Sequence, residues 1–175
     1  MAALEFKFSS DQQHQLEAIE ATCDLFRGQQ FANSSFMINQ AFYDQGRLFS
    51  DGMLPGGQAE LFDTIGHGNE LRVAPGQLLD NLHAVQEEGC LPATDVLTDG
   101  RLRDFTVEME TGTGKTYVYI RSIYELNRRY GITKFVIVVP SVAIREGVLK
   151  SFQTMRKHFE TLYDRTPLDY FVYDS

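Results

Sequence analysis

A short glycine-containing stretch constrains the fold of this chain more than any other feature. Residues 111–116 read Thr-Gly-Thr-Gly-Lys-Thr; an apolar run precedes them, and a segment with helical periodicity follows. That order of strand, glycine loop and helix is typical of a phosphate-binding P-loop. Gly112 and Gly114 lack a Cβ atom, so the backbone can curl and its N–H groups can converge on an anion.

The residues at the end of this stretch predict what the loop would hold. Lys115 can reach the β- and γ-phosphates of a nucleotide, and the Thr116 hydroxyl can ligate Mg²⁺. The full motif begins with glycine where this chain has Met109, but that glycine ends the strand and carries no phosphate contact. The alternative is an ordinary glycine turn with a solvated lysine. We predict a nucleotide site made of Thr111, Gly112, Thr113, Gly114, Lys115 and Thr116, with Lys115 and Thr116 catalytic.

Composition narrows the class of protein. The chain has 175 residues, 43% of them hydrophobic, which suits one globular domain with a core. Cys23 and Cys90 are too far apart for a metal-ligand spacing and are predicted to be buried or half-buried free thiols. The histidines show no metal-binding spacing either. No apolar run has the length of a signal-peptide core or a membrane span, so we expect no membrane contact and a cytoplasmic location.

Charge is unevenly distributed along the chain. The net charge is −8, yet residues 1–100 carry −11, residues 101–160 carry +5 and residues 161–175 carry −2. The basic excess therefore coincides with the P-loop and the segments after it, which is compatible with a nucleotide and a polyanion there. A mixture of solvated charges on exposed helix faces is the alternative.

The first part of the chain, residues 1–100, is predicted to be helical and rich in loops. Apolar residues recur at helical spacing over 11–27 and again over 75–88. Between them, residues 29–74 contain many glycines but also many aromatic residues. An ordered loop with short strands is therefore favoured over a free linker.

The helix predicted at 11–27 begins with a polar turn. Asp11 is a candidate N-cap or first-turn acid, and glutamines follow at Gln12, Gln13 and Gln15. A glutamine amide offers one acceptor and two donors on one planar group, which suits the N6/N7 edge of an adenine. A solvated helix face is the alternative interpretation of these glutamines.

The second part, residues 101–175, follows an α/β pattern. The run at 135–139 is apolar and rich in β-branched residues, which is typical of a strand buried on both faces of a parallel sheet. Strands are predicted at 105–109, 135–139 and 170–173, with helices at 115–130 and 143–159. This βαβαβ order predicts an α/β fold, with a parallel sheet in three layers and right-handed crossovers.

Residues after the second predicted strand suggest a further contact site. In open α/β sheets, ligands bind at the carboxyl ends of the strands. Ser141 can cap the helix that follows, and Arg145 lies one turn into it. A hydroxyl, free N–H groups and a guanidinium at a helix start can all contact phosphates. A capped helix with a surface arginine is the alternative.

Three segments closely resemble the restriction (Res) subunit of Type III restriction–modification enzymes, which belong to the superfamily 2 helicase-like motors. The segments are Met109–Tyr119, Tyr130–Gly147 and Tyr170–Ser175. The similarity extends over essentially the whole chain. It includes Gln15–Ile19, which looks like the adenine-reading glutamine motif of that family.

The resemblance implies a partial RecA-like P-loop motor domain. Such a motor binds ATP and Mg²⁺ and drives communication along double-stranded DNA in the bacterial cytoplasm. It acts with a methyltransferase (Mod) subunit that reads the DNA sequence, and it carries a C-terminal nuclease domain. By this resemblance, Gln15 would read adenine, Lys115 and Thr116 would hold the ATP phosphates and Mg²⁺, and Ser141 and Arg145 would contact the DNA backbone.

The sequence also departs from that family. It has no apolar strand ending in the Asp-Glu box that positions Mg²⁺ and the attacking water, and it has no second lobe, arginine finger or nuclease. We therefore expect an N-terminal piece of a longer subunit, inactive as an ATPase by itself. The alternatives are a fragment of a superfamily 2 helicase without a nuclease, a small P-loop kinase, and a P-loop module that binds a nucleotide without hydrolysing it.

Overall fold

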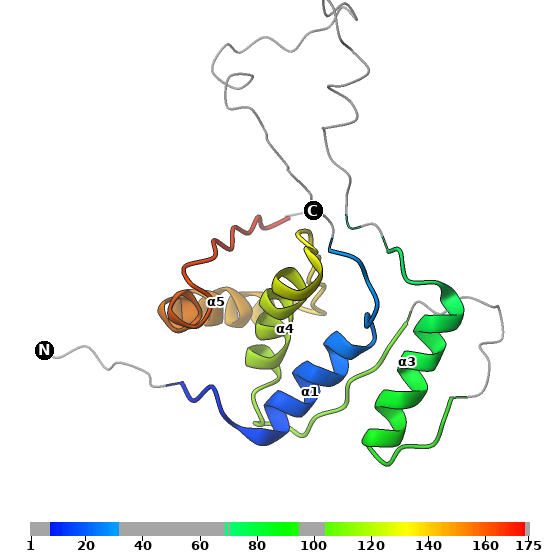
Figure 1. The fold of residues 1–175 in the computed structure, drawn as a ribbon. Helices are drawn as coiled ribbons and strands as arrows, with labels where there is room; N and C mark the ends of the chain where they lie inside the picture. The colour runs from blue at the N-terminus through cyan, green and yellow to red at the C-terminus, as the bar shows by residue number, and fades with distance from the viewer. Residues whose placement is uncertain (1–7, 32–68, 70, 95–103, 174–175) are drawn as a thin grey trace, which may run out of the picture.

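The computed structural model describes residues 8–31, 69, 71–94 and 104–173. In this part of the chain the regular elements are helices. α1 lies between α3 and α4, and α4 packs in turn against α5 (Figure 1). The bounds of the helices are α1 (Gln13–Asp24), α3 (Pro75–Glu88), α4 (Lys115–Tyr130) and α5 (Val142–Leu162).

Helix α4 occupies the middle of the arrangement because it packs against two partners. Tyr117, Ile120 and Tyr124 face α5, and the ring of Tyr124 stacks on that of Tyr163 with centroids 4.8 Å apart. The opposite face of α4 packs against α1. The buried side chains of this second cluster are Ile19, Cys23, Val118 and Leu126.

Terminal residues explain why α4 and α5 begin and end where they do. Glycines in the left-handed conformation flank α4, and the N–H of Gly131 bonds to the Asn127 carbonyl at its C-terminal end. Ser141 caps α5, because its side-chain oxygen accepts from the N–H of Ile144 at 3.3 Å. The predicted cap on α5 is therefore confirmed by the geometry.

The predicted helices agree with the structure, with differences at their ends. The prediction of 75–88 matches α3, and that of 115–130 matches α4. Helix α1 ends four residues before Gly28, which closes the following turn at φ +93°. Asp11 is not the N-cap, since Gln12 holds that position without a side-chain bond, and Asp11 instead accepts from the Ser9 hydroxyl.

A buried carboxylate links three helices. Glu125 of α4 is 6% exposed, accepts from the Tyr163 hydroxyl after α5 at 2.8 Å, and bonds to Arg128 and Arg129. Arg129 also bonds to Glu20 of α1 at 2.8 Å. Burial disfavours the ionised form of Glu125, but the donors around it outweigh that effect and hold its pKa below the usual value.

The predicted parallel sheet is not formed among the described residues, so the α/β fold expected from the sequence is wrong for this structure. Residues 105–109, 135–139 and 170–173 have no regular secondary structure, and no strand ladder joins them. Val136 and Val138 are 88% and 87% exposed, and Phe171 is 90% exposed. A strand buried on both faces would hide these side chains.

These segments lie against helices instead of against one another. Met109 and Phe135 pack onto the α1–α4 cluster, and the ring of Tyr170 stacks on that of Phe152 in α5, with centroids 5.4 Å apart. A hollow of about 820 Å³ is lined by both 135–139 and 168–173. The two segments therefore face a shared hollow, and their N–H and C=O groups form no ladder with each other.

Some expectations fall outside the described residues or concern single side chains. Most of the loop predicted at 29–74 lies outside the described ranges. Cys23 is buried, as predicted, whereas Cys90 is exposed; both thiols are free. Over the described ranges, no helix combines the length and apolar character that crossing a bilayer requires.

Candidate functional site

The glycine loop joins residues 104–110 to α4. Gly112 and Gly114 have φ of +84° and +91°, in the left-handed region that glycine adopts without strain. The Thr113 hydroxyl donates to the Glu110 carbonyl at 2.7 Å and closes the turn. The structure therefore forms a tight turn that depends on both glycines, at the position where the sequence predicts one.

Lys115 lies at the first position of α4 and folds back over the loop. Its ammonium group donates to the carbonyl oxygens of Met109 and Glu110, the latter at 2.6 Å. The side chain thus spans the loop from its end to its start. Thr116 follows in the first turn of α4 and is half-exposed. The two residues predicted to be catalytic are adjacent at the N-terminus of a 16-residue helix, where the helix dipole favours an anion.

The first turn of α1 contacts the loop directly. Gln15 is 7% exposed, and its Nε2 donates to the Thr113 carbonyl at 2.9 Å. Nε2 of His14 lies 3.1 Å from the same oxygen. A Cβ atom on Gly114 would overlap the Gln15 amide nitrogen. Gln15, predicted to read adenine, is therefore placed beside the glycine loop and is hydrogen-bonded to its backbone.

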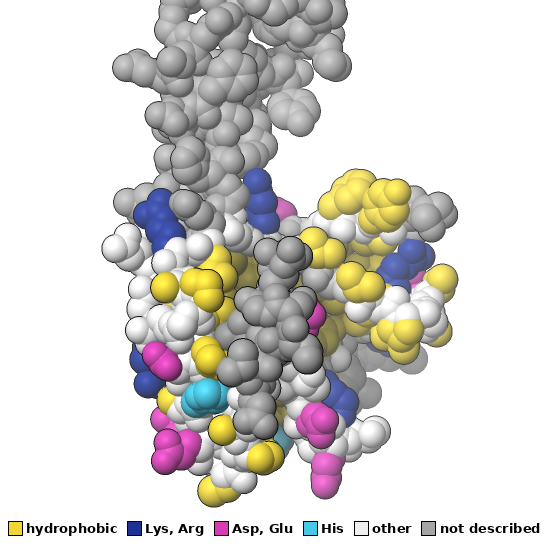
Figure 2. All heavy atoms as spheres, turned by 90° about the vertical axis from the view of Figure 1, so that its right-hand side faces the viewer, with side chains coloured by type: hydrophobic (Ala, Val, Ile, Leu, Met, Phe, Trp, Pro, Cys, Tyr) yellow, Lys and Arg dark blue, Asp and Glu magenta, His cyan; other side chains and the backbone are white. Residues whose placement is uncertain are grey.

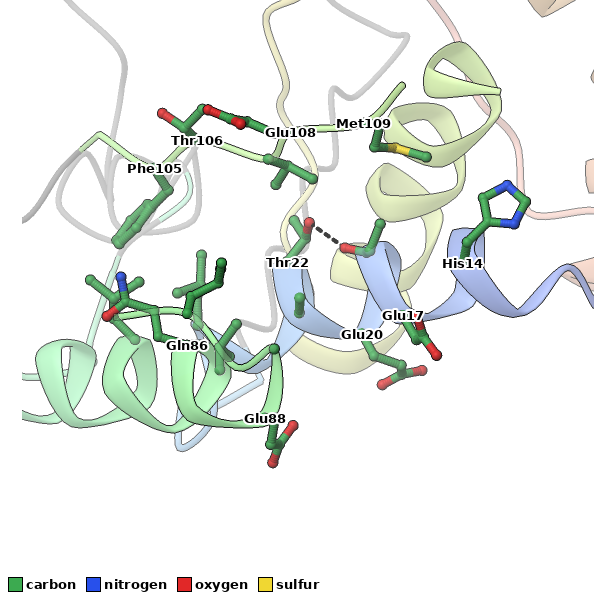
Figure 3. Close-up of a pocket in the computed structure, with 18 of the residues that line it drawn as sticks. His14, Glu17, Glu20, Thr22, Gln86, Glu88, Phe105, Thr106, Glu108 and Met109 are labelled. Carbon is green, nitrogen blue, oxygen red and sulfur yellow. Dashed lines mark hydrogen bonds between the residues drawn. The ribbon is translucent and has the colours of Figure 1, made fainter. Parts of the chain in front are cut away.

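A groove of about 1040 Å³ runs between α1, α3 and residues 104–110 and reaches the loop at Thr113. Figure 3 shows that Phe105 points toward the helices, whereas Thr106 and Glu108 point away from them. Figure 2, viewed from the α3 side, shows acidic side chains gathered at the lower end of this face. The acidic residues that line the groove are Glu17, Glu20, Glu88, Asp104, Glu108 and Glu110.

The loop and this groove differ in the sign of their charge. Among the described residues that line the groove there is no lysine or arginine. Its negative field opposes a polyphosphate, whereas Lys115 and the N-terminus of α4 attract one. A Cβ atom built on Gly112 meets no atom within 4 Å, so the loop is open on that side. The chemistry of the loop thus suits the phosphates of a nucleotide and its Mg²⁺, with the Thr116 hydroxyl close by in the first turn of α4.

Ser141 and Arg145, the predicted DNA contacts, lie together at the N-terminus of α5. The Ser141 hydroxyl oxygen is used in the helix cap, and an Arg145 Nη atom is 3.5 Å from a Glu146 carboxylate oxygen. Both residues line the 820 Å³ hollow, and neither lines the groove beside the P-loop. The structure therefore keeps the two predicted sites in different surroundings.

His14 is a site residue that the sequence reasoning missed. A single histidine at the start of a helix, with no metal-binding spacing, gave no sign of a role. The signal lay in its position, because it directly precedes the glutamine that contacts the loop. Likewise, the carbonyl groups that hold Lys115 belong to the backbone, so the residue types do not predict them.

Comparison with known proteins gives the class of this protein. The family described as "Type III restriction enzyme, res subunit" matches residues 9–165, which is most of the chain. The chain belongs to this family, and the resemblance stated from the P-loop and neighbouring segments is confirmed.

Individual Res subunits are similar over shorter stretches. The Res subunit of the Type III restriction-modification enzyme EcoPI, from Escherichia phage P1, is 37% identical over 105 residues, which is 59% of this chain. The EcoP15I Res subunit of Escherichia coli is 34% identical over 105 residues, again 59% of the chain. The StyLTI Res subunit of Salmonella typhimurium is 53% identical over 66 residues, or 36% of the chain. The matched stretches span 11%, 11% and 7% of the respective relatives, so they cover about a tenth of the length of those subunits or less.

Proposed function

We propose that this chain is the nucleotide-binding part of a Type III Res subunit and that it holds Mg²⁺–ATP at the loop of residues 111–116. The observation that carries the proposal is the loop itself. Two left-handed glycines form the turn, Lys115 spans it, and Thr116 lies in the first turn of the helix whose positive end faces it. Membership of the family supports the same assignment.

Each residue has a separate task in this proposal. The ammonium group of Lys115 exchanges its two backbone carbonyl partners for phosphate oxygens. The Thr116 hydroxyl ligates Mg²⁺, and the metal, when bound, supplies neutralisation of phosphate charge. Thr111, Gly112, Thr113 and Gly114 contribute backbone N–H groups to the cradle. Gln15 contributes from α1, and its preference for adenine stays a prediction.

The whole subunit is proposed to act in ATP-dependent restriction of foreign DNA in the bacterial cytoplasm. Its partners would be double-stranded DNA and the methyltransferase (Mod) subunit of the same system. Within this chain, Ser141 and Arg145 are the proposed DNA contacts. Arg145 would exchange its pair with Glu146, which is weak because the carboxylate is mostly exposed, for a phosphate. Binding through so few contacts is expected to weaken steeply as salt rises.

Titration of Mg²⁺–ATP into the chain tests the nucleotide site. Lys115→Ala removes the only lysine or arginine among residues 111–116 and is expected to weaken binding by at least tenfold. Lys157→Ala, an exposed lysine of α5, is the matched control and is expected to bind like the parent. Equal affinities for the parent and Lys115→Ala would contradict the proposal.

A further inference from the structure

The carbonyl oxygen of Thr113 has two side-chain donors facing it, and both come from the first turn of α1. Gln15 Nε2 donates at 2.9 Å, and His14 Nε2 lies at 3.1 Å. A carbonyl oxygen only accepts, so the His14 nitrogen that faces it carries the hydrogen. A carbonyl has two lone pairs, and these two donors occupy both of them.

Two donors on one carbonyl fix the orientation of a whole peptide unit. The Thr113 C=O and the Gly114 N–H belong to the same rigid plane, and no peptide bond in the described residues is cis. In a trans peptide the C=O and the N–H point in opposite directions. Because the carbonyl is held toward α1, the Gly114 N–H points away from α1.

That N–H group is available for a ligand. Within residues 104–173 and the other described ranges, no hydrogen bond uses the Gly114 N–H. Gly114 must adopt φ +91° for this orientation, and a side chain at this position would collide with Gln15. Gln15 is itself buried, so its polar amide is stabilised by the bond to the loop rather than by water.

We propose that His14 and Gln15 form a two-donor anchor that presets the Thr113–Gly114 peptide, so that the Gly114 N–H is aimed at a phosphate oxygen before a nucleotide arrives. This inference rests on the proposed nucleotide function of the same loop. It assigns Gln15 a task that is independent of the base, and it makes His14 a positioning residue. Preset donors bind an anion more tightly because no reorientation is needed at the moment of binding.

The test compares three ligands that share phosphates but differ in the base. Mg²⁺–ATP, Mg²⁺–GTP and Mg²⁺–tripolyphosphate are titrated into the parent, His14→Ala, Gln15→Met and the double variant. Methionine keeps the buried volume of Gln15 and removes its donor. Each single variant is expected to weaken all three ligands by about fivefold, as for the loss of one hydrogen bond, and the double variant by more.

Controls separate the anchor from a general loss of structure. Gln13→Ala removes an exposed glutamine of the same turn, whose amide bonds to Glu17, and is expected to leave all three affinities unchanged. His14→Gln retains an N–H donor and is expected to restore binding to within about twofold of the parent. The thermal unfolding midpoint checks that each variant is folded.

A second readout needs no ligand. The backbone amide resonance of Gly114 in the free protein is expected to shift in the double variant and to stay in place in Gln13→Ala. An unchanged resonance would overturn the anchor, whatever the affinities are. A loss of affinity confined to Mg²⁺–ATP would also overturn the anchor, and would instead support an adenine-reading role for Gln15. If the resonance shifts but Lys115→Ala leaves nucleotide affinity intact, the nucleotide function fails while the structural anchor stands.

Discussion

The two faces of α4 differ in how well the segments next to them are buried. Toward α1, Ile19 and Cys23 are packed, Arg129 bonds to Glu20, and Gln15 bonds to the Thr113 carbonyl of the glycine loop. On the α5 face, the aromatic cluster between α4 and α5 is also buried. The neighbouring residues 135–139 and 170–173, however, leave large apolar side chains exposed.

The comparison shows that the site and the exposed segments depend on different parts of the fold. The glycine loop of residues 111–116 is held by contacts among the described residues, namely two glycine conformations, two carbonyls on Lys115 and two donors on Thr113. Residues 135–139 and 170–173, by contrast, leave large apolar side chains exposed. Changes in the helical part should therefore affect stability strongly, while changes on the exposed segments should affect it little.

The largest contrast is expected between two phenylalanines. Phe159 of α5 is 2% exposed in the aromatic cluster, whereas Phe171 is 90% exposed. Phe159→Ala should lower the free energy of unfolding by about 3–5 kcal/mol, because it removes buried area and leaves a cavity. Phe171→Ala should change it by less than about 0.5 kcal/mol. Urea unfolding measures both, and similar losses would break the comparison.

A smaller effect is expected at the buried carboxylate. Glu125→Gln leaves Arg129 and the Tyr163 hydroxyl with a weaker partner and should cost about 1–3 kcal/mol. Glu146→Gln is the matched control, because that carboxylate is 62% exposed, and it should have almost no effect. Urea unfolding at neutral pH tests this pair of variants.

The same carboxylate predicts a pH dependence. The folded-state pKa of Glu125 is depressed, so its contribution is present above the unfolded pKa near 4.5 and is lost as pH falls through the lower folded value. As the pH falls below about 5, the free energy of unfolding of the parent should therefore decrease more than that of Glu125→Gln. Parallel pH profiles for the two proteins would contradict this assignment.

The next contrast lies within the loop. Alanine at Gly112 or Gly114 is strained at positive φ by about 1–3 kcal/mol, but only at Gly114 does the new Cβ meet the Gln15 amide. Gly114→Ala should therefore destabilise the chain more than Gly112→Ala does. If the thermal unfolding midpoints of the two variants coincide, the contact between α1 and the loop is not tight.

The smallest perturbation is chemical labelling of the two thiols. Cys23 is buried between α1 and α4, and burial raises its pKa to about 12; Cys90 is exposed after α3. Iodoacetamide at pH 8 should modify Cys90 readily and leave Cys23 intact until the chain unfolds, because the thiolate is the reactive form. Mass spectrometry of peptides identifies the site, and early labelling of Cys23 would show that the α1–α4 contact opens.

Local signals in the sequence accounted for the helices and the loop. The bounds of α4 were predicted because glycines stop the helix on both sides, and those of α3 because Pro75 begins it and Gly89 follows it. The same kind of signal predicted a buried strand at 135–139, and the structure forms no strand there. Such a signal could not predict pairing, since a ladder depends on which distant segment lies alongside. The family was recognised from the P-loop and the residues after α4, where the residue types themselves carry the resemblance.

The contact between α1 and the P-loop also has a consequence for the order of synthesis. Gln15 and Thr113 are 98 residues apart in the chain. A ribosome adding about 5–20 residues per second would make α1 roughly 5–20 seconds before its partner emerges. During that interval Ile19 and Cys23 have no α4 to cover them, so the burial of α1 depends on a loop and a helix that are made long after it.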